Sequence, residues 1–298
     1  MHQPTPGLPE FDYVKPSSLS EASLFLAEHA SEARPLLGGT DTFVRLRDGV
    51  WKDKYLVDVK NLEGMSEISF DFETGLAIGA AVSMNRVINS QVAQEQYPLL
   101  VQAAGTVASY QLRSRATIVG NICNASPAGD TIGACIVHHA VLRVHGLEGF
   151  REEPLTDFFQ GPGRTCLKPG DVVVSIRFPV PPERHAGIYI KLGRNASSDL
   201  AIVGVTALGY SDHAAASGTR FRLALASVAP IPVVPTAAEQ ILANNPLNEE
   251  TIIEAAIAAQ ETAKPISDPR GSSRYRKLMV KNLTIRAVKE VWDQLGRI

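Results

Sequence analysis

Two loops of this chain combine glycines with hydroxyl, amide and carboxyl side chains, which are groups that bind phosphates and sugars. The first loop is LLGGTDTF (36–43), and the second is TIVGNICNASPAGD (117–130). Glycine lets the backbone approach a ligand and adopt positive φ. The start of a helix offers unpaired N–H groups and a partial positive charge to a phosphate. A phosphate-bearing ligand is therefore the first chemistry to consider at both loops.

The first loop joins an apolar run to an amphipathic stretch, so Gly38 and Gly39 lead to a helix expected to start at Thr40 or Asp41. One interpretation is a phosphate site at that helix. The alternative is a tight turn between a strand and a helix, with Asp41 as the helix cap. Neither the pattern GxxxxGK(S/T) nor a well-placed GxGxxG is present, so no common nucleotide motif decides between them.

The second loop has too many turn-forming residues for the interior of a helix or strand, and it is too apolar for a solvent loop. One interpretation is a turn-rich connection whose polar side chains bond locally. The other is a ligand site, because buried polar groups need partners. In that case Thr117, Asn121 and the Gly120 N–H would face a pyrophosphate, and Asp130 would accept from a sugar hydroxyl or a ring N–H.

Other candidate residues have a simpler structural interpretation. His138 and His139 are adjacent and lack the spacing of a metal pair, and Cys123 is expected to be a small buried residue rather than a nucleophile. No GxSxG motif is present. The basic run at 272–286 is expected to be a solvated helix face or a docking face.

The elements around the first loop are expected in the order β-α-β-α-β. A strand near Tyr13, a helix capped by Ser18 with Glu21, and strands at 34–37 and 54–60 frame the loop. Farther on, strands are expected at 75–82 and 171–179, broken helical patterns at 83–108, and a β-like run within 133–144. Past a proline-rich boundary at 179–187, strands are expected at 187–193, 201–210 and 220–229, and helices at 235–243, 248–263 and 273–295.

Composition places the chain among ordinary globular proteins. It has 298 residues, 45% of them hydrophobic, and a net charge of -2, which gives no electrostatic case for nucleic acid or an anionic membrane. Its three cysteines show no CxxC spacing and are too few for a four-cysteine iron–sulfur cluster. We expect a soluble cytoplasmic protein without membrane insertion, because no apolar run approaches about 18 residues.

Taken together, the two loops resemble those of the FAD-binding medium subunit of the molybdenum hydroxylases, the family of xanthine dehydrogenase and carbon monoxide dehydrogenase. LLGGTD is similar to the family's AGGT(D/N), and ATIVGNICNASPAGD to TIGGN-x-x-x-ASP-x-x-D. The likeness continues in FFQGPGRTCLKPGDVVVSIRFP (158–179), ASVAPIPVVPTAAEQIL (226–242) and DPRGSSRYRKLMVKNLTIRAV (268–288). These five segments, in order, span nearly the whole chain.

The resemblance implies an α+β fold. It consists of a two-subdomain FAD-binding unit, similar to that of vanillyl-alcohol oxidase, and a C-terminal domain with a three-stranded antiparallel sheet and three helices. The expected divisions are 1–60 and 61–180 for the two FAD-binding subdomains and 187–298 for the C-terminal domain. The resemblance also implies cofactor-binding roles for Leu36, Leu37, Gly38, Gly39, Thr40, Asp41, Thr42, Thr117, Gly120, Asn121, Asp130, Val174 and Lys191, with no catalytic residue and no metal ligand.

Three positions depart from the family pattern. Val119 replaces a glycine of TIGGN, Asn195 replaces the second arginine of a usual pair, and Val107 stands where xanthine dehydrogenases have an aromatic ring. The segment 141–154 looks short, as if a surface hairpin were trimmed. The first departure bears on how closely the backbone can approach FAD.

The function implied is electron transfer in a molybdenum-containing hydroxylase or dehydrogenase. One FAD on this chain would take electrons from [2Fe-2S] clusters of a small subunit and pass them to an external acceptor. A large subunit would carry the molybdenum cofactor, in a dimer of heterotrimers. Two alternatives stay open: a flavin-free bridging subunit, and a stand-alone NAD(P)H-dependent flavin reductase.

Overall fold

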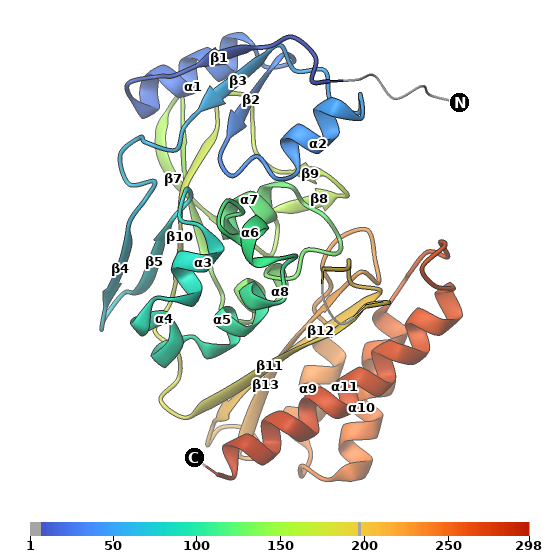
Figure 1. Ribbon diagram of the computed structural model, residues 1–298. Coiled ribbons are helices and arrows are strands. Elements are labelled where there is room, and N and C mark those ends of the chain that lie inside the picture. Colours follow the sequence, from blue (N-terminus) through green and yellow to red (C-terminus); the bar gives the residue numbers. More distant parts are fainter. Residues whose placement is uncertain (1–6, 196–197, 298) are drawn as a thin grey trace.

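The computed structural model describes residues 7–195 and 198–297, so the predicted domain ends at Met1 and Ile298 lie outside it. Figure 1 shows an N-terminal and a C-terminal sheet at opposite ends of the molecule, with short helices between them. Within the described residues, no helix has the length and apolar character needed to cross a membrane.

The N-terminal sheet is parallel and has the predicted β-α-β-α-β order. The Ser18 hydroxyl accepts the Glu21 N–H and caps the first helix, as expected from the sequence. The strands, in spatial order, are β1 (Asp12–Val14), β3 (Tyr55–Asp58) and β2 (Ala33–Leu36), and the helices are α1 (Leu19–Glu28) and α2 (Thr42–Arg47).

The middle part of the chain forms a five-stranded antiparallel sheet with six short helices. The segment 141–154 is a complete hairpin with Leu147 and Glu148 at its turn. The strand order is β4 (Ile68–Asp71), β5 (Gly75–Gly79), β10 (Val172–Phe178), β6 (Val141–Gly146) and β7 (Gly149–Pro154). A separate pair is β8 (Phe159–Gly161) and β9 (Arg164–Thr165), and the helices are α3 (Met84–Ile88), α4 (Gln91–Gln96), α5 (Pro98–Gly105), α6 (Tyr110–Arg113), α7 (Ile118–Cys123) and α8 (Ile132–Val137).

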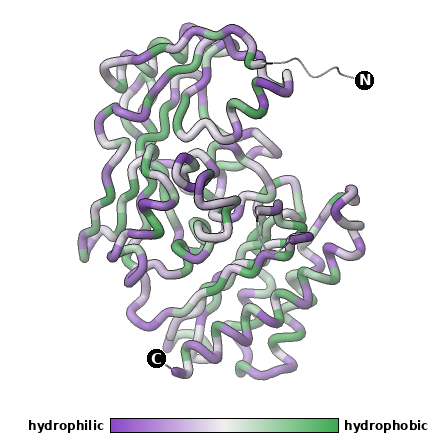
Figure 2. Tube along the Cα trace, viewed as in Figure 1, coloured by the Kyte–Doolittle hydropathy of each residue, from purple (hydrophilic) through white to green (hydrophobic). Residues whose placement is uncertain are grey.

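The C-terminal domain has the predicted three-stranded antiparallel sheet and three helices. Figure 2 shows hydrophobic and hydrophilic segments alternating along its last helix, whose buried side packs on the sheet. The first strand starts two residues before the expected boundary at 187. The elements are β11 (His185–Leu192), β12 (Val203–Ser211), β13 (Thr219–Ala226), α9 (Thr236–Asn244), α10 (Glu249–Thr262) and α11 (Ser273–Leu295).

One local prediction is wrong and another is confirmed only in part. The composition of the second loop argues against a helix, but the loop contains α7. In 133–144 the β-like run is confirmed by β6 from Val141, whereas the residues before it belong to α8. Helices this short are unstable alone. The Thr117 hydroxyl caps α7 by accepting the Gly120 N–H, and Ile118, Val119 and Ile122 are buried. Capping and tertiary burial therefore outweigh the turn-forming composition.

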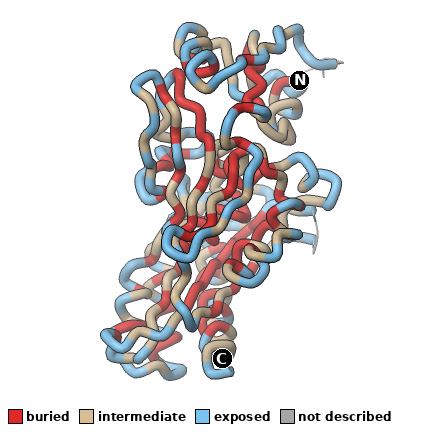
Figure 3. The backbone as a smooth tube through the Cα atoms, turned by 90° about the vertical axis from the view of Figure 1, so that its left-hand side faces the viewer, coloured by how far each residue is buried: buried red, intermediate tan, exposed pale blue. Residues whose placement is uncertain are grey.

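Buried residues follow the sheets and the short helices around them, as Figure 3 shows. One large core surrounds the middle sheet, and a second lies between the C-terminal sheet and its helices. The two parts meet where α8 packs against β12 and β13. A Cβ on Gly133 of α8 would lie 2.2 Å from Thr206 Oγ1 of β12, so this contact requires glycine.

Replacing Gly133 with alanine is expected to destabilise the chain by about 2 kcal/mol, because the added methyl overpacks a closed contact. Thr206→Ala in the same chain should recover most of that loss, since it removes the nearest atom. Thr206 Oγ1 is buried and has no hydrogen-bond partner within 7–195 and 198–297, so Thr206→Ala alone should cost little. Urea unfolding of the two single variants and the double variant measures the coupling; an additive result would contradict the contact.

Candidate functional site

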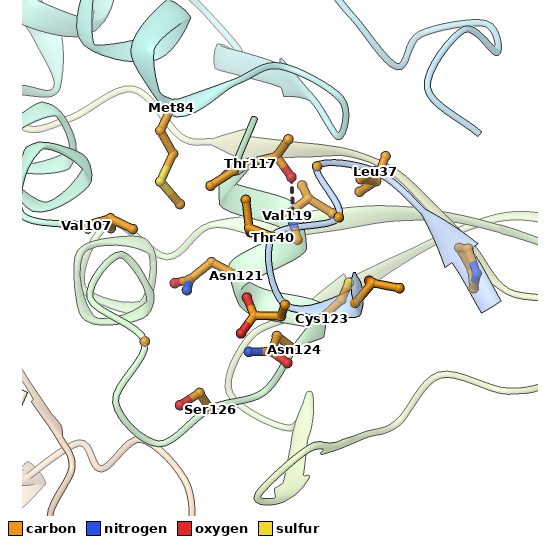
Figure 4. A pocket seen from close by; sticks show the side chains of 18 of the residues that line it. Leu37, Thr40, Met84, Val107, Thr117, Val119, Asn121, Cys123, Asn124 and Ser126 are labelled. Carbon is orange, nitrogen blue, oxygen red and sulfur yellow. Dashed lines mark hydrogen bonds between the residues drawn. The ribbon is translucent and has the colours of Figure 1, made fainter. Parts of the chain in front are cut away.

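The two predicted loops line a single cavity of about 520 Å³. Figure 4 shows Asn121, Asn124 and Ser126 of the second loop in the cavity, together with Val107 and, from the first loop, Leu37 and Thr40. The wall thus carries amide and hydroxyl groups on one stretch and apolar side chains on others. Further lining comes from residues near Arg34 and Trp51, from Met84, from 107–116, from 163–173 and from 198–200.

The first loop lies directly against the backbone that precedes the second. A Cβ on Gly38 would be 2.2 Å from the Arg115 carbonyl oxygen, and Gly39 has φ +74°, so both positions need glycine. Interpretation of the first loop as a tight turn expects the Asp41 side chain to cap the helix. Asp41 does precede α2, but its side chain makes no capping hydrogen bond. The Asp41 residue instead lines the cavity.

The second loop presents polar atoms held at fixed positions. Thr117 Oγ1 accepts the Gly120 N–H at 2.9 Å, and Asn121 Oδ1 accepts from the Thr131 hydroxyl at 2.8 Å. The Asn124 Oδ1 atom is buried and has no hydrogen-bond partner among the described residues. An unpaired buried acceptor is costly, so Asn124 is a position where a ligand donor would be favourable.

Asp130 ends the second loop and is bound by the C-terminal domain. Its carboxylate accepts from the Tyr189 hydroxyl and from Lys191 Nζ, each at 2.7 Å, and both partners are on β11. Burial raises the pKa of Asp130, while the bonds from Lys191 and Tyr189 oppose that rise. Burial, followed by the charge of Asp130, raises the pKa of Tyr189 well above its ordinary value. The sequence named Asp130 and Lys191 separately, and the structure joins them in one ion pair.

The structure places all but three of the predicted site residues on the cavity wall. Leu36 packs in a small core with Leu46 and Leu56. Val174 is buried in the middle core beside the lining residues of β10, and Lys191 lies behind Asp130. The residues on the wall are Leu37, Gly38, Gly39, Thr40, Asp41, Thr42, Thr117, Gly120, Asn121 and Asp130.

Several lining residues were not predicted. The Arg34 guanidinium stacks 3.6 Å from the Trp51 ring centre, and Arg34 also pairs with Asp53. Only the tertiary fold brings these residues to the cavity. Asn124 and Ser126 could have been found, because they lie in the loop that the sequence singled out. Val107, which stands where xanthine dehydrogenases have an aromatic ring, also lines the cavity. The other lining residues that were not predicted include Met84, Thr165, Leu167, Asp171, Ser198, Asp199 and Leu200.

His138 is buried in the core, whereas Cys123, expected to be buried, is half-buried and lines the cavity. Burial raises the pKa of Cys123 to about 12, so its thiol is protonated and a poor nucleophile at neutral pH. Burial lowers the pKa of His138 to about 3, and its ring packs near Tyr97 and Phe178. Over 7–195 and 198–297 no three His, Cys, Asp or Glu residues are grouped so that they could hold a metal ion.

Family models match nearly the whole chain. Residues 9–181 match the FAD binding domain in molybdopterin dehydrogenase, and residues 188–291 match the CO dehydrogenase flavoprotein C-terminal domain. This chain belongs to the FAD-binding medium subunits of the molybdenum hydroxylases. The predicted family and fold class are thereby confirmed, and the chain is an oxidoreductase subunit with an FAD-binding domain.

Individual relatives are similar to this chain over nearly their full lengths. The xanthine dehydrogenase FAD-binding subunit of Escherichia coli O157:H7 is 29% identical over 95% of this chain and 97% of its own length. The glyceraldehyde dehydrogenase medium chain of Sulfolobus acidocaldarius is 31% identical over 95% and 99%. A carbon monoxide dehydrogenase structure from Hydrogenophaga pseudoflava superposes with a TM-score of 0.91 at 30% identity, covering 96% of this chain and 99% of that one.

The cavity fits FAD on its own geometry. Gly38 allows two backbone segments to meet, the hydroxyl and amide groups suit phosphate and ribityl oxygens, and Asn124 Oδ1 lacks a donor among the described residues. Val119, the departure from the glycine pattern, has its side chain 1% exposed in the middle core. The extra side chain is therefore accommodated mainly by packing.

Asn124→Ala is expected to weaken FAD binding about tenfold, because the buried acceptor would lose a ligand donor. Stability without FAD should change little or rise, since the unpaired atom disappears. Fluorescence titration of the apo-chain with FAD measures the affinity, and Asn245→Ala, at the exposed end of α9, is the control. Equal FAD affinity in the Asn124 and Asn245 variants would rule out a ligand contact at Asn124.

Proposed function

We propose that this medium subunit takes electrons from the [2Fe-2S] clusters of a small partner subunit and passes them to an external acceptor. The observation that carries the proposal is the single cavity made by the two loops in a chain whose family binds FAD. FAD supplies one-electron and two-electron chemistry when bound, and the protein supplies binding, orientation and electrostatics. No acid or base of this chain is needed for that task.

The proposed FAD-binding residues are those predicted from the sequence. The first-loop set from Leu36 to Thr42, with Thr117, Gly120 and Asn121, is proposed to hold the pyrophosphate. The proposal for these residues is supported because they line the same cavity. The exception is Leu36, whose side chain packs in the small core with Leu46 and Leu56. Asp130, Val174 and Lys191 are proposed to serve the adenosine or flavin side, with Asp130 and Lys191 supported by their buried ion pair.

The proposed partners are a large subunit with the molybdenum cofactor and a small subunit with [2Fe-2S] clusters, in a dimer of heterotrimers. Relatives carry the names carbon monoxide dehydrogenase medium chain and 6-hydroxypseudooxynicotine dehydrogenase complex subunit alpha, which belong to assemblies. The three cysteines are free, which suits a cytoplasmic location.

The proposed domain division remains 1–60, 61–180 and 187–298. This division is supported because each sheet is formed by strands from one of the three segments. The parallel sheet ends at Asp58, the five-stranded sheet runs from Ile68 to Phe178, and the last sheet starts at His185. Expression of the segment 181–298 alone tests the last boundary, because the C-terminal domain should fold without the rest of the chain.

Purification of the chain from its native host tests the function. We expect flavin absorption, FAD released on denaturation, and co-purifying iron–sulfur and molybdenum subunits. Absence of flavin with partners present would support a bridging subunit instead. FAD without partners, together with NAD(P)H oxidation by the isolated chain, would support a stand-alone reductase.

A further inference from the structure

Arg276, in the first turn of α11, is a buried cation with no assigned role. Its side chain is 4% exposed, and a positive charge near a helix N-terminus is unfavourable. Asp268 pairs with it at 2.7 Å and offsets part of the cost of burying the charge. Both residues belong to the 268–288 segment that resembles the family pattern but does not line the cavity.

The guanidinium binds two backbone carbonyls at one end of the C-terminal sheet. Nη1 of Arg276 donates to the Ile202 oxygen at 2.6 Å and to the Ser227 oxygen at 3.1 Å. Ile202 directly precedes β12, and Ser227 directly follows β13. Ser227 has φ +64°, a conformation that costs a non-glycine residue about 1–3 kcal/mol. The bond from Arg276 therefore helps to hold a strained peptide.

The strained peptide supports the second loop. The Ser227 N–H donates to the Pro127 oxygen at 2.7 Å, and the neighbours of Pro127, which are Ser126 and Ala128, both line the cavity. If Ser227 relaxed to negative φ, its N–H would turn away from Pro127. The orientation of this part of the cavity wall thus depends on the bond between Arg276 and the Ser227 carbonyl.

A second path leads from Arg276 to another wall. The Ile202 N–H donates to the Leu192 oxygen at 2.7 Å, so the chain at Ile202 is fixed between β11 and Arg276. Two residues earlier, Leu200 lines the cavity, and Lys191, beside Leu192, pairs with Asp130. The buried Arg276 side chain thus fixes the backbone that supports two separate parts of the cavity wall.

We infer that Arg276 is a positioning residue of the FAD cavity, acting from the C-terminal domain through Ser227 and Ile202. The inference rests on the proposed use of this cavity for FAD. Arg276 sets where the second loop and the 198–200 segment lie, and it touches neither the cavity nor the reacting ring. Lysine cannot replace it fully, because only the planar guanidinium presents several donors in a fixed fork.

The test compares Arg276→Met and Arg276→Lys with Arg274→Met, an exposed arginine on the same helix. FAD titration of the apo-chains should show a loss of affinity of at least about tenfold for Arg276→Met, a smaller loss for Arg276→Lys, and no change for Arg274→Met. The visible circular dichroism of bound FAD should change in the Arg276 variants alone, which a purely stabilising residue would not cause.

Ser227→Gly provides a rescue. Glycine adopts positive φ without strain, so adding Ser227→Gly to Arg276→Met should recover part of the FAD affinity. Folded Arg276 variants with wild-type affinity and dichroism would overturn the inference; if Arg276→Met does not fold, Arg276→Lys decides by the same measurements. A wild-type chain that binds no FAD would instead refute the proposed function.

Discussion

Gly38→Ala is expected to yield a chain that purifies without FAD and binds it at least about 100-fold more weakly. The alanine Cβ would lie 2.2 Å from the Arg115 oxygen and 2.8 Å from the Arg115 carbonyl carbon. Both are backbone atoms, so no side-chain rotation relieves the clash. The two segments must separate by about 1 Å to reach van der Waals contact, and the cavity wall between them opens.

Gly105→Ala is the matched control for that loss. Gly105 ends α5 on the surface, and a Cβ there would meet no atom of the described residues within 4 Å outside its own helix backbone and chain neighbours. Alanine has the higher helix propensity, so the control should be as stable as the wild type or slightly more stable. The flavin-to-protein ratio after desalting, followed by FAD titration, measures both variants. Stoichiometric FAD in the Gly38 variant would contradict a close-packed first loop.

Lys191→Met is expected to destabilise the chain by about 3 kcal/mol at neutral pH, because it leaves the buried Asp130 carboxylate without its cation. On the proposed placement of the flavin side of FAD beside Asp130 and Lys191, the variant should also make bound FAD harder to reduce, since a cation near the ring favours the reduced anionic form. Asp130→Asn should move the reduction potential in the opposite direction. Spectroscopic redox titration of the two variants measures these shifts, and an unchanged potential in Lys191→Met would exclude the electrostatic role.

The stability loss in Lys191→Met should depend on pH. Burial already raises the pKa of Asp130, and removing Lys191 removes bonds and charge that lower it. A group with a raised folded pKa contributes stability that is present at low pH and is lost as pH rises through that pKa. The deficit should therefore be larger at pH 8 than at pH 5. The double variant Asp130→Asn with Lys191→Met has no carboxylate to titrate at this position. Its loss of unfolding free energy should therefore be smaller and independent of pH.

The sequence was sufficient for the elements with strong periodicity. The last helix was expected at 273–295, as observed, and the strands of the C-terminal sheet fell within a few residues of their predicted places. Long segments bury a whole face, so their pattern carries the signal. Helices α7 and α8 have no such pattern, and their stability comes from the Thr117 cap and from burial that local sequence does not reveal.

The candidate site was predictable only where its groups are adjacent in sequence. Gly38, Gly39, Gly120 and Asn121 stood out because each loop concentrates polar and glycine residues. Arg34 and Trp51 reach the same cavity through packing across strands and loops. The role of Arg276 depends on hydrogen bonds to Ile202 and Ser227, which are far from it in the chain.

The cavity wall is assembled from segments that begin at Arg34 and end at Leu200, and it contains pieces next to all three main sheets. A partly folded chain therefore lacks a complete binding site, and free FAD shifts the folding equilibrium toward the fully assembled state by mass action. Proteolytic resistance of the whole chain should then rise with FAD concentration. Through this linkage, the FAD concentration would control how much of the chain remains folded.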